Sequence, residues 1–205
     1  MKTSSLPISL LAALLFLTGC ASNPFAAAKK AGIHTVQLMP VEYGDMRYGM
    51  DVTKLDDPFG AARTDMMNDV GQDGLRRMQK LMQKHHMDVP RMIYDRVKLQ
   101  LQNQPDLTLV PQSPADGMIA VKIVQYGFTD MPFTLMHEIP FVMVQAELRD
   151  KNGHKIWTRK SKLSLPAEDD AGASWDDYES HPEELRDEWN AQVIEAVIQL
   201  IPYGE

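Results

Sequence analysis

The stretch Phe141–Arg149 constrains the fold more than any other part of the chain. Apolar and polar side chains alternate along it, which is the period of a strand with one buried face. The turn Asp150-Lys151-Asn152-Gly153 follows, and an Asn-Gly pair between two such runs is typical of a tight hairpin. The run Ile156–Leu165 is the returning strand. We therefore expect an antiparallel sheet in the second half of the chain.

The remaining elements follow from the same periodicities. Further strands are predicted at His34–Tyr43, Leu107–Val110 and Met118–Tyr126. Apolar residues at helical spacing predict a helix over Ala61–Lys84 and a second helix that begins at the N-cap Asp88 and ends at Gln104-Pro105-Asp106. This order predicts a single α+β domain, a mainly antiparallel sheet with helices on one face, arranged roughly β-α-(α)-β-β-β-β-α.

The C-terminal segment predicts one more helix. Ser180 and Glu183 have the spacing of a capping box, with Pro182 between them, and the helix stops at Pro202. Its apolar face is predicted to consist of Leu185, Trp189, Val193, Val197 and Leu200.

The N-terminal segment carries one positive charge, Lys2, and an apolar run from Leu6 to Leu17 that is too short to span a bilayer. The run closes with Leu17-Thr18-Gly19-Cys20. This pattern resembles the lipobox of bacterial lipoproteins. The resemblance implies that the sulfur of Cys20 receives a diacylglycerol, that cleavage precedes Cys20, and that the new amino group is acylated. The alternative is an incidental thiol at the end of an uncleaved anchor. Cys20 is the only cysteine, so no disulfide is expected.

The segment after Cys20 sets the expected location and domain limits. Position 21 is Ala, not the Asp that commonly signals inner-membrane retention in enterobacterial lipoproteins, so the resemblance implies the outer membrane, facing the periplasm. Residues 1–19 are the expected signal peptide, and 20–33, small and polar, the expected lipidated tether. Fully extended, Ala21–Gly32 would reach about 40 Å. Residues 34–205 are the expected single domain.

The domain also resembles small envelope lipoproteins, namely the activators of penicillin-binding proteins and the curli-secretion lipoproteins. The shared features are the lipobox, a Leu38-Met39-Pro40 strand end, and Ala115-Asp116-Gly117 opening a strand after the helices. No functional residue is carried over from this likeness.

Charge is concentrated in one region. The chain has a net charge of −7, and ten acidic residues face one basic residue, Arg186, between Glu168 and Glu188. No basic stripe is available for nucleic acid. The segment Glu168–Glu179 is interpreted as a solvated loop, with Ca²⁺ binding or docking of a basic partner as the alternatives.

Two groups of side chains are candidates for a site. Met78, Met82 and His85 would share a helix face, and with His86 they form a possible Cu(I) or Ag(I) site; the competing interpretation is that methionine fills the core and the histidines end the helix. The other group lies in an apolar connection between two strands, and its members would contact a protein partner: Phe128, Met131, Phe133, Leu135 and Met136. The alternative there is a long hairpin whose side chains join the core.

Motifs for catalysis are missing from the sequence. His137-Glu138 does not continue as a zinc-protease motif, because Phe141 occupies the second histidine position and Pro140 opposes a helix. No nucleophile elbow or phosphate-binding loop is present. We therefore expect a non-catalytic envelope lipoprotein without a cofactor, apart from the covalent lipid, that binds a protein partner. Copper binding is the alternative, and a hydrolase with a site built from distant residues ranks third.

Overall fold

A mixed sheet and the helices on one of its faces make up the described part of the chain. The computed structural model describes residues 24–48, 73–112, 114–130, 138–163 and 172–202. The strands are β1 (Thr35–Leu38), β2 (Asp45–Tyr48), β3 (Thr108–Val110), β4 (Gly117–Asp130), β5 (Glu138–Asp150) and β6 (Lys155–Lys160). The helices are α1 (Pro24–Lys30), residues 73–84, α3 (Val89–Gln102), α4 (Trp175–Ser180) and α5 (Pro182–Leu200).

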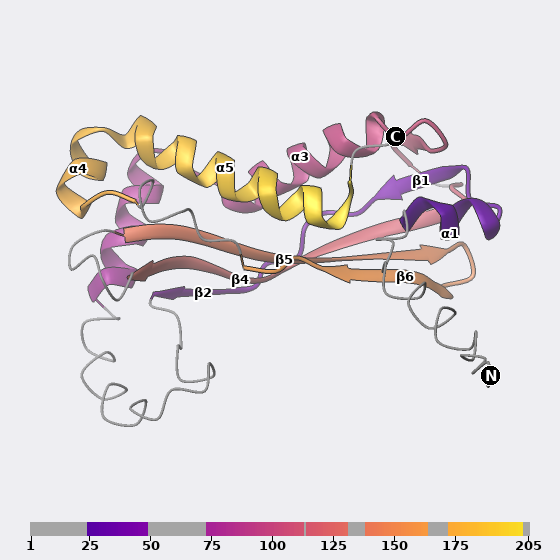
Figure 1. Ribbon diagram of the computed structural model, residues 1–205, viewed down its shortest axis with the longest axis horizontal. Helices are drawn as coiled ribbons and strands as arrows, with labels where there is room; N and C mark the ends of the chain where they lie inside the picture. Colours follow the sequence, from indigo (N-terminus) through magenta and orange to yellow (C-terminus); the bar gives the residue numbers. More distant parts are fainter. Residues whose placement is uncertain (1–23, 49–72, 113, 131–137, 164–171, 203–205) are drawn as a thin grey trace, which may run out of the picture.

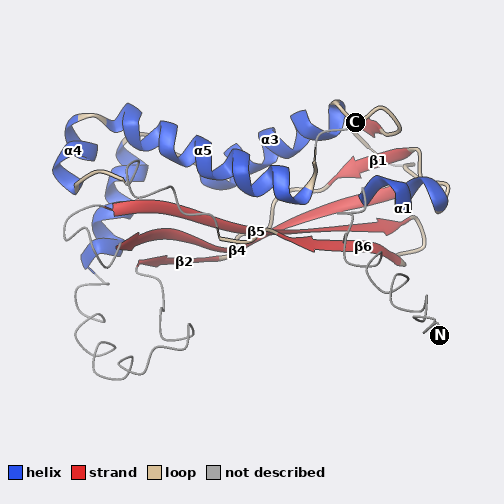
Figure 2. Cartoon of the chain, viewed as in Figure 1, coloured by secondary structure: helices blue, strands red, loops and turns tan. Residues whose placement is uncertain are grey.

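The sheet has the order β3-β1-β4-β5-β6, and β2 pairs with the second half of β4. β1 and β2 join their neighbours in parallel, whereas β4, β5 and β6 are antiparallel. The long β4–β5 ladder makes the sheet mostly antiparallel. The predicted α+β class is therefore confirmed, and the connection of β1 to its neighbours makes the sheet mixed. In Figure 2 the helices α3 and α5 cover one face of the strands.

The predicted β5–β6 hairpin is present. Gly153 has a φ of +85°, which a residue without Cβ adopts without strain. Oδ1 of Asp150 accepts hydrogen bonds from the backbone N–H groups of Asn152 and His154, both at 2.8 Å. The Asn-Gly signal therefore placed this turn correctly, while β6 ends at Lys160, earlier than predicted.

A β-bulge in β4 changes which side chains face the helices. The register shifts between Ile123 and Gln125, so that Val124 is the extra residue. Before the bulge Ile123 points toward the helices, and after it Tyr126 and Phe128 do so. One inserted residue thus moves the buried set from odd to even positions. The bulge turns Phe128 into the core.

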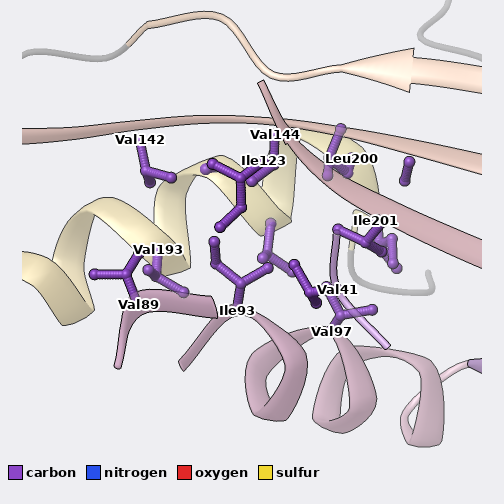
Figure 3. Packing of buried hydrophobic residues seen from close by; sticks show 14 of the residues in the cluster. Val41, Val89, Ile93, Val97, Ile123, Val142, Val144, Val193, Leu200 and Ile201 are labelled. Atoms are coloured by element: carbon purple, nitrogen blue, oxygen red, sulfur yellow. The ribbon is translucent and has the colours of Figure 1, made fainter. Parts of the chain in front are cut away.

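The core lies between the sheet and the two long helices. Figure 3 shows Ile123 and Val144 of the sheet close to Ile93 of α3 and Val193 of α5. As predicted, Asp88 caps α3 by accepting a hydrogen bond from the N–H of Arg91 at 3.1 Å. The predicted apolar face of α5 is confirmed, since all its members are buried: Leu185, Trp189, Val193, Val197 and Leu200.

The capping box predicted for the last helix is wrong in position. α5 begins after His181, whose side chain makes no capping hydrogen bond, so Ser180 and Glu183 do not cap it. The box occurs at α4 instead, where Ser174 and Asp177 bond reciprocally. The acidic region is consequently helical from Trp175 to Ser180, not a loop throughout.

The predicted tether over residues 20–33 is also wrong in extent. Residues Pro24–Lys30 form α1, in which Phe25 is 4% exposed and Ala28 is fully buried. The ring of Phe25 meets that of Trp157 on β6 edge-on, with centroids 6.1 Å apart. A seven-residue helix is too short to be stable alone, so this docking holds it. The domain thus begins about ten residues earlier than the sequence indicated, whereas residues 1–23, with Cys20, lie outside the described part.

Candidate functional site

Apart from Phe128, the predicted partner segment follows β4 and precedes β5, and the flanking residues Asp130 and Glu138 pair at one end of the sheet. Figure 1 shows α4 at this end and α1 at the opposite end of the molecule. Phe128 is fully buried and so offers no surface to a partner. The rest of the predicted contact lies outside the described residues and stays a prediction: Met131, Phe133, Leu135 and Met136. The alternative of extended strands is correct for β4 up to Asp130 and β5 from Glu138.

Aromatic rings from three elements meet around Phe128. Its ring centroid lies 5.1 Å from that of Trp175, 6.1 Å from Tyr178 and 5.6 Å from Trp189. Tyr126, two residues earlier on the same face, meets Trp189 at 6.3 Å. Tilted and edge-on pairs contribute about 0.5–1.5 kcal/mol each beyond their buried area. This cluster fixes α4 and α5 on the end of β4.

Tyr178 ties the same end together through its hydroxyl group. The oxygen lies 2.7 Å from the carbonyl oxygen of Glu138 and 2.6 Å from Oε2 of Glu188, and it accepts the N–H of Ala173 at 3.1 Å. Burial, followed by the hydrogen bond to Glu188, raises the pKa of Tyr178 far above its ordinary value. The phenol therefore keeps its proton and acts as a structural anchor, not as a base.

Backbone pairing places the start of α4 against β5. Glu138 and Ala173 form an isolated antiparallel bridge, in which the N–H of Glu138 donates to the Ala173 carbonyl at 2.9 Å. Gly172 has a φ of +46°, and a Cβ there would lie 2.4 Å from the Glu138 carbonyl oxygen. Only glycine fits such a close approach. The sequence contains this glycine between two alanines, but nothing local signals the contact.

Arg77 connects the helical residues 73–84 to α4. Its Nη2 lies 2.7 Å from Oδ1 of Asp176, its Nε lies 2.9 Å from Oε1 of Glu179, and its guanidinium lies 5.8 Å from the ring centre of Trp175. The hydrogen bond to Glu179 is the main cause that raises the pKa of Arg77. Sequence analysis missed this residue, because its partners are about a hundred positions away.

An exposed acidic surface remains at this end. We define the acidic strip as the exposed carboxylates of α4 and of the first two turns of α5: Asp176, Asp177, Glu179, Glu183, Glu184 and Asp187. Glu183 and Glu184 stand at the N-terminus of α5, where its dipole favours negative charge. Arg77 offsets part of the charge on α4. The strip is thus formed by two helices, whereas the sequence predicts a solvated loop over Glu168–Glu179.

The side chains of the predicted Cu(I) or Ag(I) site differ in their exposure. Met78 is fully buried, Met82 is 6% exposed, and both belong to the core; His85 is half-buried and His86 is exposed. Nε2 of His85 is buried and meets no hydrogen-bond partner among the described residues. Within that part of the chain, no three His, Cys, Asp or Glu side chains are grouped for a metal ion. Copper binding stays a prediction.

Two shallow depressions mark the described surface. One, of about 160 Å³, lies between α3 and α5 beside Arg91 and Arg186. The other, of about 180 Å³, lies at the α1 end between Gly32 and Lys151. Sites for drug-sized ligands or cofactors typically measure about 300–1,000 Å³. Neither of these two depressions reaches that size, so the acidic strip is a better candidate for a functional surface than either of them.

Comparisons with known proteins add little at this level. No family model matches the sequence, and no curated protein matches it. A Xanthomonas campestris protein described as DUF330 (XCC0632) aligns with a TM-score of 0.47 and 8% identity over 82% of this chain and 81% of that one. The hypothetical protein CT253 of Chlamydia trachomatis gives 0.34 and 12% over 82% and 98%. Lipoprotein GNA1162 of Neisseria meningitidis gives 0.28 and 12% over 75% and 98%. Such values assign neither a family nor an activity.

None of the helices in the described part of the chain has the length and apolar character that a membrane crossing requires.

Proposed function

We propose that this protein is a lipid-anchored component of the bacterial outer membrane that faces the periplasm and binds another envelope protein without catalysing a reaction. The observation that carries the proposal is the sequence Leu17-Thr18-Gly19-Cys20 at the end of a short apolar run. Acyl chains contribute about 0.8 kcal/mol per buried CH₂, so several chains on Cys20 hold the protein to the membrane almost permanently.

The mechanism of such a protein is confinement. An anchor restricts the domain to a thin layer above the bilayer, which raises its effective concentration near a partner in the membrane or the cell wall. The domain then needs a rigid surface and no reaction centre. The aromatic cluster around Phe128 supplies rigidity, and the acidic strip supplies a charged surface beside it.

The proposed contact combines two features of the α4 end. One is the apolar segment with Met131, Phe133, Leu135 and Met136, whose flanking residues Asp130 and Glu138 pair at the end of the β4–β5 ladder. The other is the acidic strip. A partner that fits has a basic rim around an apolar patch, because charge steers the encounter while apolar burial supplies most of the affinity.

The test is a crosslinked pull-down of the lipidated protein from its native membrane. Phe133→Asp/Leu135→Asp is compared with Leu99→Asp/Ile194→Asp, in which the altered residues are 47% and 37% exposed on α3 and α5. We expect one envelope protein to co-purify with the wild type and the control pair and to be lost from the first pair, with Glu183→Lys/Glu184→Lys weakening its recovery. Equal recovery with all variants would contradict the proposed contact.

The anchor is tested separately by mass spectrometry of the N-terminal peptide and by flotation with membranes. We expect an acylated Cys20 as the first residue and complete loss of flotation in Cys20→Ser. An unmodified Cys20 in the mature protein would overturn the anchored function as a whole.

The second candidate, Cu(I) or Ag(I) binding, is favoured by one observation, the buried Nε2 of His85 without a described partner. Anaerobic Cu(I) titration of the domain decides it. Saturable binding at micromolar or lower concentration that is lost in Met82→Leu/His85→Gln, but kept in the control Met118→Leu/His181→Gln, would support a metal-handling protein.

A further inference from the structure

The distance along the chain between the proposed anchor and the first packed residues is very short. Phe25 is 4% exposed against Trp157, and α1 begins at Pro24. Only residues 21–23 separate Cys20 from this helix. Four peptide steps span at most about 14 Å, in contrast to the roughly 40 Å expected from a tether that reached Gly32.

A tether of this length determines which end of the domain lies close to the membrane. β5 has 13 residues and runs from the α4 end, where Glu138 begins it, to the α1 end, a distance of about 43 Å at about 3.3 Å per residue. Figure 1 shows α1 and α4 at opposite ends of the long axis. If α1 is held beside the lipid headgroups, the acidic strip cannot reach them unless the domain lies flat.

Charge opposes the flat orientation. From Trp175 to Glu188 the chain has seven acidic residues and one basic residue, Arg186, and anionic headgroups repel such a surface. The α1 end differs in this respect. Lys30 is the last residue of α1 and Lys151 lies in the β5–β6 turn; both are exposed, and neither forms an ion pair with a residue that the structure describes.

These two lysines belong to neighbouring loops. The depression at this end is lined by Ala31 and Gly32 from the turn after α1 and by Lys151 and Asn152 from the hairpin. Asp116 and Asp150 also line it, and their carboxylates accept hydrogen bonds from backbone N–H groups of His34 and Thr35 and of Asn152 and His154. The N–H of Lys151 also donates to the carbonyl oxygen of Asp116 at 2.9 Å, which fixes the hairpin beside the start of β4. The turn after α1 and the hairpin therefore form one continuous end surface.

We infer that this end surface, residues 30–32 with Lys151 and Asn152, contacts the phosphates of the bilayer that holds the Cys20 lipid, so that the domain stands upright with α4 and the acidic strip directed away from the membrane. The inference rests on the proposed lipid anchor. It adds an orientation: the lipid surface occupies the α1 end, which leaves the α4 end free for a protein partner.

The experiment places a fluorophore at either end of the full lipidated protein. When the sulfur of Cys20 is acylated, an introduced cysteine is the sole thiol, so Lys151→Cys and Glu184→Cys are labelled selectively. Both proteins are reconstituted in phosphatidylethanolamine–phosphatidylglycerol vesicles with or without a lipid that carries a nitroxide on its headgroup. We expect loss of fluorescence at position 151 and no loss at position 184. A third protein has ten Gly and Ser residues inserted after Ser22, and we expect it to lose the quenching at position 151.

The outcomes separate the inference from the function on which it rests. Flotation with vesicles together with quenching at position 184, at both positions or at neither would overturn the upright orientation and leave the anchor intact. Quenching that persists at position 151 after the insertion would show that the short tether does not set the orientation. A protein that fails to float, with an unmodified Cys20, would overturn the anchored function itself.

Discussion

The α4 end and the α1 end of the molecule are both secured to β4, β5 and their neighbours, but by different means. At the α4 end, Phe128 contacts rings from α4 and α5, and the Tyr178 hydroxyl bonds to the backbone of β5. At the α1 end, a seven-residue helix docks through Phe25, and its Lys29 makes an exposed ion pair with Asp106 at 3.3 Å. Exposed pairs contribute only about 0–1 kcal/mol.

The two ends differ in how far their opening is coupled to the unfolding of the rest of the domain. The α4 end joins segments that lie far apart in the chain, so it can open only when much of the fold opens. α1 is a terminal element, and its release leaves the sheet and the long helices intact. Local opening has a free energy between zero and that of global unfolding, and terminal elements belong to the low part of this range. The α4 end should therefore open together with the sheet, whereas α1 should open by itself.

The largest effect is expected at the centre of the aromatic cluster. Phe128→Ala removes a fully buried ring and leaves a cavity among Trp175, Tyr178 and Trp189, so we expect the free energy of unfolding to fall by about 3–5 kcal/mol. Urea denaturation measures it. The control Tyr43→Ala, at a side chain that is 70% exposed, should change stability by less than about 0.5 kcal/mol. A loss as small as in the control would mean that the cluster does not secure this end.

Phe25→Ala makes the same chemical change at the other end and should have a smaller global effect. Because α1 can undock alone, the loss in unfolding free energy is limited by the docking energy, and we expect less than about 2 kcal/mol. Hydrogen exchange locates it: the N–H groups of Ala31 and Ile33, bonded to carbonyls of α1, should lose protection while those of β5 keep it. Loss of protection in β5 as well would show that the two ends are equally coupled to the core.

The structure explains which elements could be predicted from sequence. The β5–β6 hairpin, the cap of α3 at Asp88 and the apolar face of α5 each depend on residues within a few positions of one another. Such local patterns agree with the fold because neighbouring side chains decide them. Local patterns do not predict the contacts at the α4 end, because Arg77 and Asp176 meet only after two helices that are distant in the chain have packed together.

The errors have physical reasons of their own. The Ser180–Glu183 pattern met the rule for a capping box, but the docking of Tyr178 places α4 over this stretch and moves the start of α5 to Pro182. The small and polar sequence of α1 predicts a tether, because a run of seven residues is too short to form a stable helix without the surface around Trp157. No local sequence pattern indicates the bulge at Val124, although this bulge is the reason why Phe128 points into the core.

Tyr178→Phe tests the polar anchor of the α4 end while it keeps the ring. The variant leaves the N–H of Ala173 without its acceptor and the carbonyl of Glu138 without this donor, so we expect a loss of about 1–3 kcal/mol in unfolding free energy. Tyr43→Phe is the matched control. A loss below about 0.5 kcal/mol would show that packing alone holds α4.

Alkaline pH gives a second measure of the same anchor. The pKa of Tyr178 is raised in the fold, so its stabilising effect is complete below the unfolded-state value of about 10 and declines as pH rises above it. The stability of the wild type should therefore fall more steeply than that of Tyr178→Phe from about pH 10 upward. Parallel pH profiles would contradict the buried, protonated phenol.

Asp116 is the corresponding polar anchor at the α1 end, and its effect should be the smallest and opposite in pH dependence. Oδ2 of Asp116 accepts hydrogen bonds from the Thr35 hydroxyl at 2.8 Å, from the Thr35 N–H at 2.9 Å and from the His34 N–H at 3.1 Å. These bonds, the hydroxyl first, lower the pKa of Asp116. A lowered folded-state pKa means that the stabilisation is present above the unfolded-state value of about 3.9 and is lost as pH falls through the folded-state value.

We therefore expect Asp116→Asn to be less stable than the wild type near neutral pH, and the difference to shrink as pH falls from about 5 to about 2. Thr35→Val keeps the carboxylate but removes the hydroxyl donor, so its pH profile should lie between the other two. Urea denaturation at each pH measures the difference, and hydrogen exchange at acidic pH should show the N–H of Thr35 losing protection before that of Tyr178. If the Asp116→Asn difference stayed constant with pH, the carboxylate would not titrate with folding, and the α1 end would depend on the docking of Phe25 alone. The two ends would then differ in polar anchoring as well as in cooperativity, since only the α4 end would have a polar anchor coupled to protonation.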